Sequence, residues 1–437
     1  MFINIEKISL CEGIKVQLPE HVFEAFTQNV CEYFSILENN VNTIRVDGAA
    51  DIISALVAFR EYFDSESDWE SITLYALDII RKGINRSHFD KISAFAGMTR
   101  IAFSLHELSE ETPKIEPFFQ GANELLLGNL HDYLEESDRK EFYSGGNYEA
   151  IMGLSGPLRY LLNFSEDKRM KDMAEKIIDV FVKRSKDGSV LGKRTPGWHY
   201  YPSEYEEVNM PTKAPNGVVN YGVSHGMGGP LVTLSIAYHK GFRVEGLLEA
   251  INGLVSEYMN ALYYVDDIAY FPGRITFEQF IGDEEITKVP TQMSWCYGPA
   301  GILRALYISG DLLSNEDVKK FALDEFLKVA KMDLYRFQLM QPIVCHGYIG
   351  TAAILNLMYL DTNRIEFLHK AIEMVEASMN FNIERFAENE RQVVTKRKTP
   401  PLWTVHDYLE GYNGIIQTAL SIIKGKSAKN EMRLLMI

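Results

Sequence analysis

The chain has 437 residues, of which 46% are hydrophobic, and a formal net charge of −16. This length is enough for two or three average domains, and the acidic balance argues against nucleic acid as a partner. The sequence holds no apolar stretch long enough to cross a bilayer, and its first residues lack the basic and apolar regions of a signal peptide. We therefore expect a cytoplasmic protein with a large apolar core.

Six glycine-led segments recur along the chain, and five of them carry a second glycine three residues after the first. Each segment opens an apolar run, and the spacing between segments, roughly 50 to 70 residues, is about the length of a helical hairpin with its loops. Because glycine has no side chain, we expect these positions to let the starts of neighbouring helices approach closely. The leading glycines are Gly97, Gly153, Gly226, Gly298, Gly347 and Gly411.

Amphipathic segments alternate with the glycine-led runs. Residues 172–185 and 371–379 place apolar side chains on one helix face, whereas residues 351–358 are apolar nearly all round. One-faced helices outside and apolar helices inside predict an all-α fold, a closed α/α toroid formed by one domain over residues 1–437. The two apolar stripes consist of Ala174, Ile177, Ile178, Phe181 and Val182, and of Ala371, Met374, Val375, Ser378 and Met379.

Two stretches interrupt the helical pattern. Residues 186–219 are rich in glycine, proline and aromatic residues, which predicts a long ordered loop. Residues 262–290 contain two short runs of β-type residues before Pro272-Gly273, which predict a small β-containing excursion. Neither stretch marks a clean domain boundary, so we expect both to be insertions in the toroid.

Three of the repeats carry chemically active residues directly before the leading glycine. Two thiolates and one imidazole are three of the four ligands of tetrahedral zinc, and such a set leaves one position open for a substrate. Judged on the residues alone, small buried thiols without metal remain the alternative, and we expect Cys11 and Cys31 to be of that kind. The three segments are Ser224-His225-Gly226, Trp295-Cys296-Tyr297-Gly298 and Cys345-His346-Gly347.

The ordered set of motifs resembles the LanC family of free-standing lanthionine cyclases, which act in lantibiotic biosynthesis. The resemblance implies the α/α toroid, with zinc held by Cys296, Cys345 and His346 and a water molecule as fourth ligand. It also matches His225 and Tyr297 to the family's active-site histidine and tyrosine. It runs from about Gly97 to Gly414 and rests on Gly153-Leu154-Ser155-Gly156, Ser224-His225-Gly226, Pro272-Gly273-Arg274, Trp295-Cys296-Tyr297-Gly298, Cys345-His346-Gly347 and Leu409-Glu410-Gly411.

The activity that this resemblance implies is addition of a peptide cysteine thiol to dehydroalanine or dehydrobutyrine in the same precursor, which forms lanthionine or methyllanthionine. Zinc suits this step because it lowers the pKa of a bound thiol, and His225 is the acid–base candidate because an imidazole titrates near neutral pH. The partners implied are a dehydrated precursor peptide with leader and core, and a dehydratase and an exporter in a membrane-associated complex. The protein would then be peripheral at the inner face of the cell membrane.

The chain departs from the family pattern at two active-site positions. Gln292 stands where the cyclases usually carry arginine, and Glu149 stands where they usually carry aspartate. Glutamate keeps the charge on a longer arm, whereas glutamine removes a fixed positive charge. A second function therefore stays open, a non-catalytic zinc toroid that binds a peptide or thiol as a scaffold in a modification complex. A glycosidase would need two carboxylates in the cavity and no metal, whereas cysteine and histidine occupy those positions here.

Overall fold

The computed structural model describes residues 3–4, 7, 15–40, 44, 46–84, 92–139, 147–201, 213–381 and 405–436. Cys11 and residues 202–212 of the predicted loop lie outside these ranges. No helix within the described ranges is both long enough and apolar enough to span a membrane. The chain divides into two compact units, which we call unit 1 (Met1–Asp90, Arg100–Asn123 and Leu339–Glu431) and unit 2 (Lys91–Thr99, Glu124–Gln338 and Met432–Ile437).

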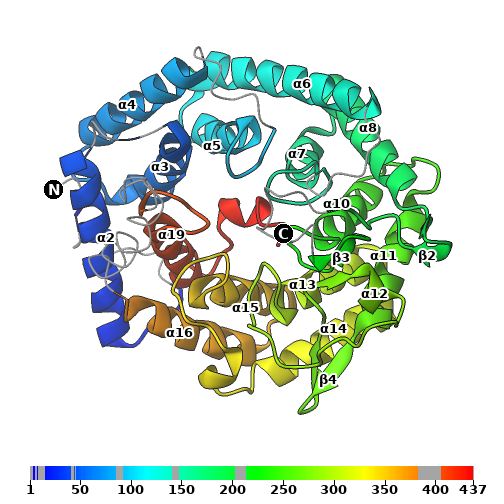
Figure 1. Cartoon of the computed structure of the whole chain (residues 1–437). Helices are drawn as coiled ribbons and strands as arrows, with labels where there is room; N and C mark the ends of the chain where they lie inside the picture. The colour runs from blue at the N-terminus through cyan, green and yellow to red at the C-terminus, as the bar shows by residue number, and fades with distance from the viewer. Residues whose placement is uncertain are drawn as a thin grey trace. The chain divides into compact units, whose positions relative to one another are not determined.

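Unit 1 is made of helices that pack in pairs (Figure 1). Helix α3 (Val46–Phe59) packs on α4 (Glu66–Ile84), and α15 (Tyr348–Thr362) packs on α16 (Ile365–Met379). Helix α19 (Tyr412–Ile423) contacts α3, α15 and α16, so it links the two pairs. The unit also contains α2 (Glu20–Asn40), which packs on α16 and α19, most of α5 (Met98–Glu111) and the start of α6 (Glu116–Arg139).

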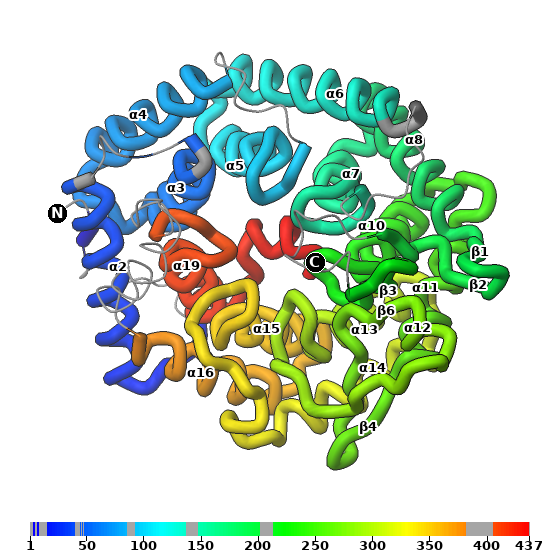
Figure 2. Tube along the Cα trace, viewed as in Figure 1, coloured from blue at the N-terminus to red at the C-terminus, as the bar shows by residue number. Residues whose placement is uncertain are grey.

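Unit 2 repeats the same arrangement, and its pairs follow one another along the chain in the tube view (Figure 2). In each pair the helix that follows a glycine motif packs on the helix after it, and α10 additionally contacts both α7 and α13. The three pairs are α7 (Ser155–Leu161) with α8 (Lys168–Arg184), α10 (Gly228–His239) with α11 (Leu247–Ala261), and α13 (Pro299–Leu312) with α14 (Glu316–Val329).

The two members of a pair differ in burial, as the sequence pattern predicts. Helix α13 is buried at every position from Pro299 to Gly310, and α19 is buried along its whole length. Helix α8 buries only the predicted stripe and its close neighbours, and α16 likewise buries all five residues of its stripe. The helices that carry apolar residues on all faces are therefore enclosed on all sides, and helices with a single apolar face pack over them.

Within the described ranges, six short strands form three antiparallel pairs. Residues 186–219 contain the hairpin β1–β2, where the sequence predicts only a loop. Its turn, Leu191-Gly192, has positive φ at both residues (51° and 78°), and a leucine in that conformation gives no recognisable hairpin signal. The strands are β1 (Gly188–Val190) with β2 (Lys193–Thr195), β3 (Val218–Asn220) with β6 (Arg274–Thr276), and β4 (Tyr263–Val265) with β5 (Ile268–Tyr270).

Several single-turn helices complete the described fold. They connect larger elements or follow a strand, as α12 does after β6. The helix α12 (Phe277–Phe280) is closed by a capping box in which Thr276 and Gln279 bond each other's backbone. The 3-10 helices are η2 (Arg60–Tyr62), η3 (Pro113–Ile115), η4 (Leu162–Phe164), η5 (Leu334–Phe337) and η6 (Lys429–Met432).

The paired glycines of the repeats lie in close contact with the backbone of the loop that precedes them. A Cβ atom at Gly301 would lie 1.9 Å from the carbonyl oxygen of Trp295, and one at Gly350 would lie 1.8 Å from that of Val344. In both cases the carbonyl belongs to the residue six positions earlier, and we call this contact the glycine clamp. The same interval occurs at Gly156, Gly226, Gly298, Gly347 and Gly414.

The glycine clamp corrects the role predicted for these residues. We expected the glycines to admit a neighbouring helix, and this holds at Gly229, where a Cβ would lie 2.8 Å from Ser155 Oγ at the start of α7. At Gly298, Gly301 and Gly350 the nearest atoms are instead backbone atoms of the chain's own loop. The loop carbonyls also take over N-capping, since the N–H of Gly301 donates to the carbonyl of Ser294 at 3.2 Å.

The first repeat, which has Arg100 in place of a second glycine, makes an ion-pair network in unit 1. Arg100 Nε donates to Asp51 Oδ1 at 3.0 Å, and its Nη2 donates to Asp407 Oδ2 at 3.2 Å. Asp407 in turn accepts from the N–H groups of Leu409 and Glu410, both at 2.8 Å. The guanidinium thus ties the loop of the last repeat to the helices of the first.

Candidate active site

Cys296 is held in the loop that the glycine clamp closes before α13. The carbonyl of Trp295, the preceding residue, lies against Gly301, so the backbone on which Cys296 stands has little freedom. The Cys296 carbonyl accepts from the N–H groups of Val223 (2.8 Å) and Ser224 (3.2 Å), which joins this loop to the one that carries His225. The Cys296 side chain is buried, with 8% of its surface exposed.

Cys345 and His346 occupy the equivalent loop before α15. Val344 is clamped against Gly350 as Trp295 is against Gly301, so Cys345 matches Cys296 in the repeat and His346 matches Tyr297. The N–H of Cys345 donates to the carbonyl of Leu409 at 3.0 Å, which ties this loop to the last repeat. Cys345 and His346 are both partly exposed.

One ligand atom from each of Cys296, Cys345 and His346 lies within 4.8 Å of the other two. The ligand atoms of a tetrahedral zinc site stand about 3.5–4 Å apart, given Zn–S bonds of about 2.3 Å and Zn–N bonds of about 2.0 Å. The three residues therefore fit a zinc ion after small side-chain rotations. The donor set, two sulfurs and one imidazole nitrogen, also suits zinc better than magnesium or calcium, which prefer oxygen ligands.

His225 contacts the carboxylate of Glu149. The distance from His225 Nδ1 to Glu149 Oε2 is 2.5 Å, and the two side chains are 48% and 1% exposed. Glu149 is fixed in turn by backbone donors, among them the N–H groups of Ile151 (3.1 Å) and Gly153 (2.6 Å). A carboxylate at Nδ1 sets the orientation of the imidazole and directs Nε2 to the opposite edge of the ring, and the exposure of the side chain leaves it accessible to a substrate.

Tyr297 lies beside His225, with 6.5 Å between the ring centroids. Its hydroxyl accepts a hydrogen bond from Asn220 Nδ2 at 3.2 Å, and burial raises its pKa to about 12 even though Asn220 and Arg274 oppose the shift. Gly222 makes room for the ring, because a Cβ there would lie 2.7 Å from it. The phenol is therefore protonated at neutral pH.

Asn220 and Arg274 are site residues for which the sequence predicts no role. The β3–β6 pairing sets them opposite each other, and Asn220 contacts the Tyr297 hydroxyl. The sequence contains only indirect signals for them. Arg274 ends the Pro-Gly-Arg motif, and the carbonyl of Asn220 lies against Gly226, six positions later.

Gln292 opens the loop that carries Cys296, and its own carbonyl is clamped against Gly298. Its side chain is partly exposed. The predicted residues thus form a cluster of three ligand candidates and a His225–Glu149–Tyr297 group, and Gln292 lies four residues before Cys296 in the sequence. Trp198 and Trp295 are core residues: Trp198 packs edge-on against Tyr148, and Trp295 donates to the carbonyl of Leu434 at 2.8 Å.

Comparison with known proteins identifies the family. The family model of the lanthionine synthetase C-like proteins matches residues 45–435. The chain belongs to this family. Among curated proteins it is similar to the nisin biosynthesis protein NisC of Lactococcus lactis subsp. lactis, with 27% identity over 277 residues. That match covers 61% of this chain and spans about three fifths (62%) of the relative's length.

A solved structure named nisin cyclase resembles this lanthionine synthetase C-like chain in fold. The TM-score is 0.71 at 20% sequence identity, and the match covers 89% of this chain and 90% of the other. The likeness confirms the predicted fold class, the all-α α/α toroid with a small β-containing part. The resemblance to lanthionine cyclases drawn from the motifs is confirmed as well.

Proposed function

We propose that this protein is a zinc-dependent lanthionine cyclase of lantibiotic biosynthesis. The observation that carries the proposal is the cluster of Cys296, Cys345 and His346, whose ligand atoms lie within 4.8 Å of one another in a member of the lanthionine synthetase C-like family. A relative named for nisin biosynthesis supports the same reaction class.

The proposed reaction adds the S–H of a precursor cysteine across the C=C bond of dehydroalanine or dehydrobutyrine. The sulfur bonds to the β-carbon, an enolate forms, and a proton is delivered to the α-carbon, so no atom is lost. Zinc, when bound by Cys296, Cys345 and His346, lowers the pKa of the substrate thiol and keeps it as a nucleophilic thiolate.

His225 is the residue proposed to move a proton. It is almost half exposed, and Glu149 holds it at Nδ1, so Nε2 is the nitrogen that would exchange protons with the substrate. Because Glu149 is buried and bonded to three backbone N–H groups, it acts as a positioning residue that fixes the angle of the imidazole.

Tyr297, Asn220 and Arg274 form the polar surroundings of the proposed reaction centre. The Tyr297 hydroxyl oxygen accepts a hydrogen bond from Asn220, which limits rotation of the Tyr297 side chain. Arg274 is a cation close enough to lower the pKa of Tyr297 against the effect of burial, and Gln292 adds no charge. Fixed positive charge near a developing enolate is stabilising, so Arg274 would supply part of what an arginine at position 292 supplies in other cyclases.

The proposed substrate is a dehydrated precursor peptide with leader and core. We propose a dehydratase and an exporter as partners in a membrane-associated complex, with the protein peripheral at the inner face of the membrane.

The alternative function is a non-catalytic zinc protein that binds a peptide or thiol. Gln292 favours it, because the neutral amide lacks the charge of the expected arginine. The contact between His225 and Glu149 favours the enzyme, since a thiol-binding scaffold has no use for a positioned acid–base group.

The test is a cyclisation assay with a dehydrated peptide that contains one cysteine and one dehydroalanine. Because cyclisation leaves the mass unchanged, free thiols are counted by alkylation over time, with zinc-loaded protein, with chelator-treated protein and without protein. Loss of thiols only with the zinc-loaded protein supports the proposal. Thiols that persist for every peptide tested, together with retained peptide binding, would favour the scaffold function.

A further inference from the structure

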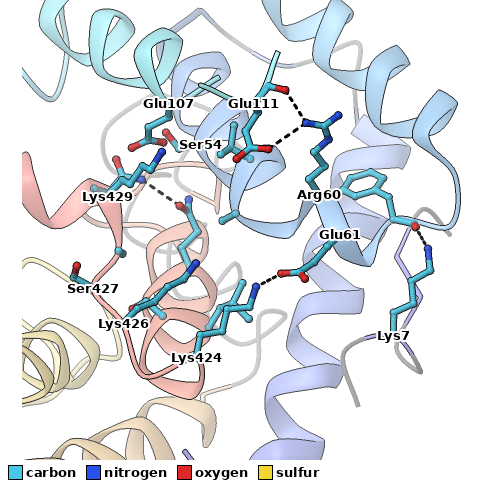
Figure 3. A pocket seen from close by; sticks show the side chains of 18 of the residues that line it. Lys7, Ser54, Arg60, Glu61, Glu107, Glu111, Lys424, Lys426, Ser427 and Lys429 are labelled. Carbon is cyan, nitrogen blue, oxygen red and sulfur yellow. Dashed lines mark hydrogen bonds and ion pairs between the residues drawn. The ribbon is translucent and has the colours of Figure 1, made fainter. Parts of the chain in front are cut away.

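The segment that follows α19 belongs to both compact units in turn. Residues 426–430 line a cavity of about 580 Å³ in unit 1, and Figure 3 shows Lys426, Ser427 and Lys429 on its wall. Among the described residues that line it, five are basic and five are acidic, so the cavity favours neither an anion nor a cation. Residues 432–437 belong to unit 2, where Arg433-Leu434-Leu435-Met436 are each at most 2% exposed. We call these four residues the anchor segment.

The anchor segment is bonded to the tryptophan that precedes Cys296. Trp295 Nε1 donates to the carbonyl of Leu434 at 2.8 Å, and only 1% of Trp295 is exposed. The carbonyl of Trp295 lies against Gly301 in the glycine clamp, so Trp295 is held both at its backbone and at the far end of its side chain. Because the indole–carbonyl bond is buried, breaking it would leave two polar groups without water as a substitute. Cys296, the next residue, takes its position from Trp295.

Two arginines fix the anchor segment independently of Trp295. Arg304 on α13 donates from Nε to the carbonyl of Met436 at 2.8 Å, and Arg433 Nε donates to the carbonyl of Ala94 at 3.1 Å. Arg304 and Arg433 are 4% and 1% exposed. Hydrogen bonds from a charged donor are stronger than neutral ones, and more so when they are buried. The anchor segment can therefore serve as a fixed support for the Trp295 side chain.

Phe95 supports Trp295 from a second direction. Its ring centroid lies 6.3 Å from that of Trp295 and 4.9 Å from the guanidinium carbon of Arg433. All of these residues belong to unit 2, as Cys296 does. Aromatic packing thus holds the ring of Trp295 in place, while its N–H fixes the ring to the anchor segment, and a mutation can separate the two contributions.

We propose that Trp295 is a positioning residue for the metal site and that the anchor segment is the support that fixes it. A ligand held in place beforehand needs less ordering when the metal binds, so the anchor segment increases metal affinity without reaching the metal. The proposal rests on the proposed function in one respect, namely that Cys296 is a metal ligand. The position of Cys296 can nevertheless be measured in protein without metal.

The first test measures how fast the Cys296 thiol reacts with iodoacetamide in chelator-treated protein. Trp295→Phe keeps an aromatic ring and removes the N–H donor, so the loop should open more often and Cys296 should be alkylated about fivefold faster or more. Cys31 is the internal reference, because it is also 8% exposed, lies in unit 1 and should react at the wild-type rate. Mass spectrometry of tryptic peptides separates the two cysteines.

The second test measures metal binding. In a chelator competition, the zinc affinity of Trp295→Phe should fall about threefold or more, and the visible absorption bands of its cobalt(II) form should shift because they report ligand geometry. Trp69→Phe is the matched control, since Trp69 Nε1 donates to the carbonyl of Leu56 at the same 2.8 Å and Trp69 is 2% exposed, but both residues lie in unit 1. The control should lower stability and leave Cys296 alkylation, zinc affinity and the cobalt spectrum unchanged.

Equal alkylation of Cys296 in the wild type and in Trp295→Phe would overturn the proposal, and so would an equal effect of Trp69→Phe or an unchanged zinc affinity. If Trp295→Phe does not fold, as checked by circular dichroism, Arg304→Met decides, because it removes the bond to Met436 and should also speed the alkylation of Cys296. A wild-type rate in that variant would then overturn the proposal. A wild type that binds no zinc would contradict the proposed function, whereas the alkylation rates would still decide whether Trp295 positions Cys296.

Discussion

Replacement of Gly301 by alanine should loosen the proposed metal site from a distance, because the glycine clamp leaves no space for a methyl group. The new Cβ would lie 1.9 Å from the Trp295 carbonyl oxygen, whereas real Cβ contacts almost never fall below 3.0 Å. The loop must therefore move by about 1.1 Å. Such overpacking costs about 1–3 kcal/mol, and loss of the hydrogen bond from Gly301 N–H to Ser294 adds about 1 kcal/mol.

The same displacement acts on Cys296, the residue after Trp295. Metal–ligand distances tolerate about 0.2 Å, so a shift of this size should weaken zinc binding at least tenfold in a chelator competition. Gly253→Ala in α11 is the control, because nothing lies within 4 Å of the added Cβ. It should stabilise the protein by up to about 1 kcal/mol in urea unfolding and leave zinc affinity unchanged. If Gly301→Ala matched the wild type in both assays, the clamp would not position Cys296.

Three further predictions concern His225, the Gln292–Glu149 pair and His406. His225→Asn should retain zinc and slow thioether formation by about 100-fold or more, and loss of metal in that variant would instead make His225 a ligand. Gln292→Arg and Glu149→Asp should show coupled effects on the cyclisation rate, on the order of 0.5–3 kcal/mol, whereas strictly additive effects would mean that the positions act independently. Burial lowers the pKa of His406 to about 4, so the unfolded chain takes up a proton first as the pH falls. The free energy of unfolding should then decrease from about pH 6.5 to pH 4 by up to about 3 kcal/mol. In His406→Phe, the urea midpoint should depend less on pH over this range. An unchanged pH dependence would show that folding does not lower the pKa of His406.

The sequence predicts the helical fold well because its signals are local. A helix that buries one face needs apolar residues three and four apart, and the stripe from Ala174 to Val182 has this spacing and is buried. The repeated glycines likewise mark where the fully buried helices begin, as at Gly298 and Gly347, which are the N-cap residues of α13 and α15. Helix type and position follow from such patterns without knowledge of distant contacts.

Contacts between distant segments could not be predicted in the same way. The hairpin at Leu191-Gly192 depends on a leucine with positive φ, which no propensity favours. The contact between Asn220 and Tyr297 depends on how the β3–β6 pair meets the loop before α13, 77 residues away. The motifs thus predict which residue types are available for chemistry, while their mutual distances come only from the three-dimensional structure.

The most direct test of the central claim is the zinc content of the purified protein, measured by elemental analysis. We predict one zinc per chain in the wild type and loss of the metal in the Cys296→Ala, Cys345→Ala double variant. The helical signal of that variant should stay near wild type, since apolar packing rather than metal builds the core. Full zinc occupancy in the double variant, or no zinc in the wild type after expression with added zinc, would contradict the assignment.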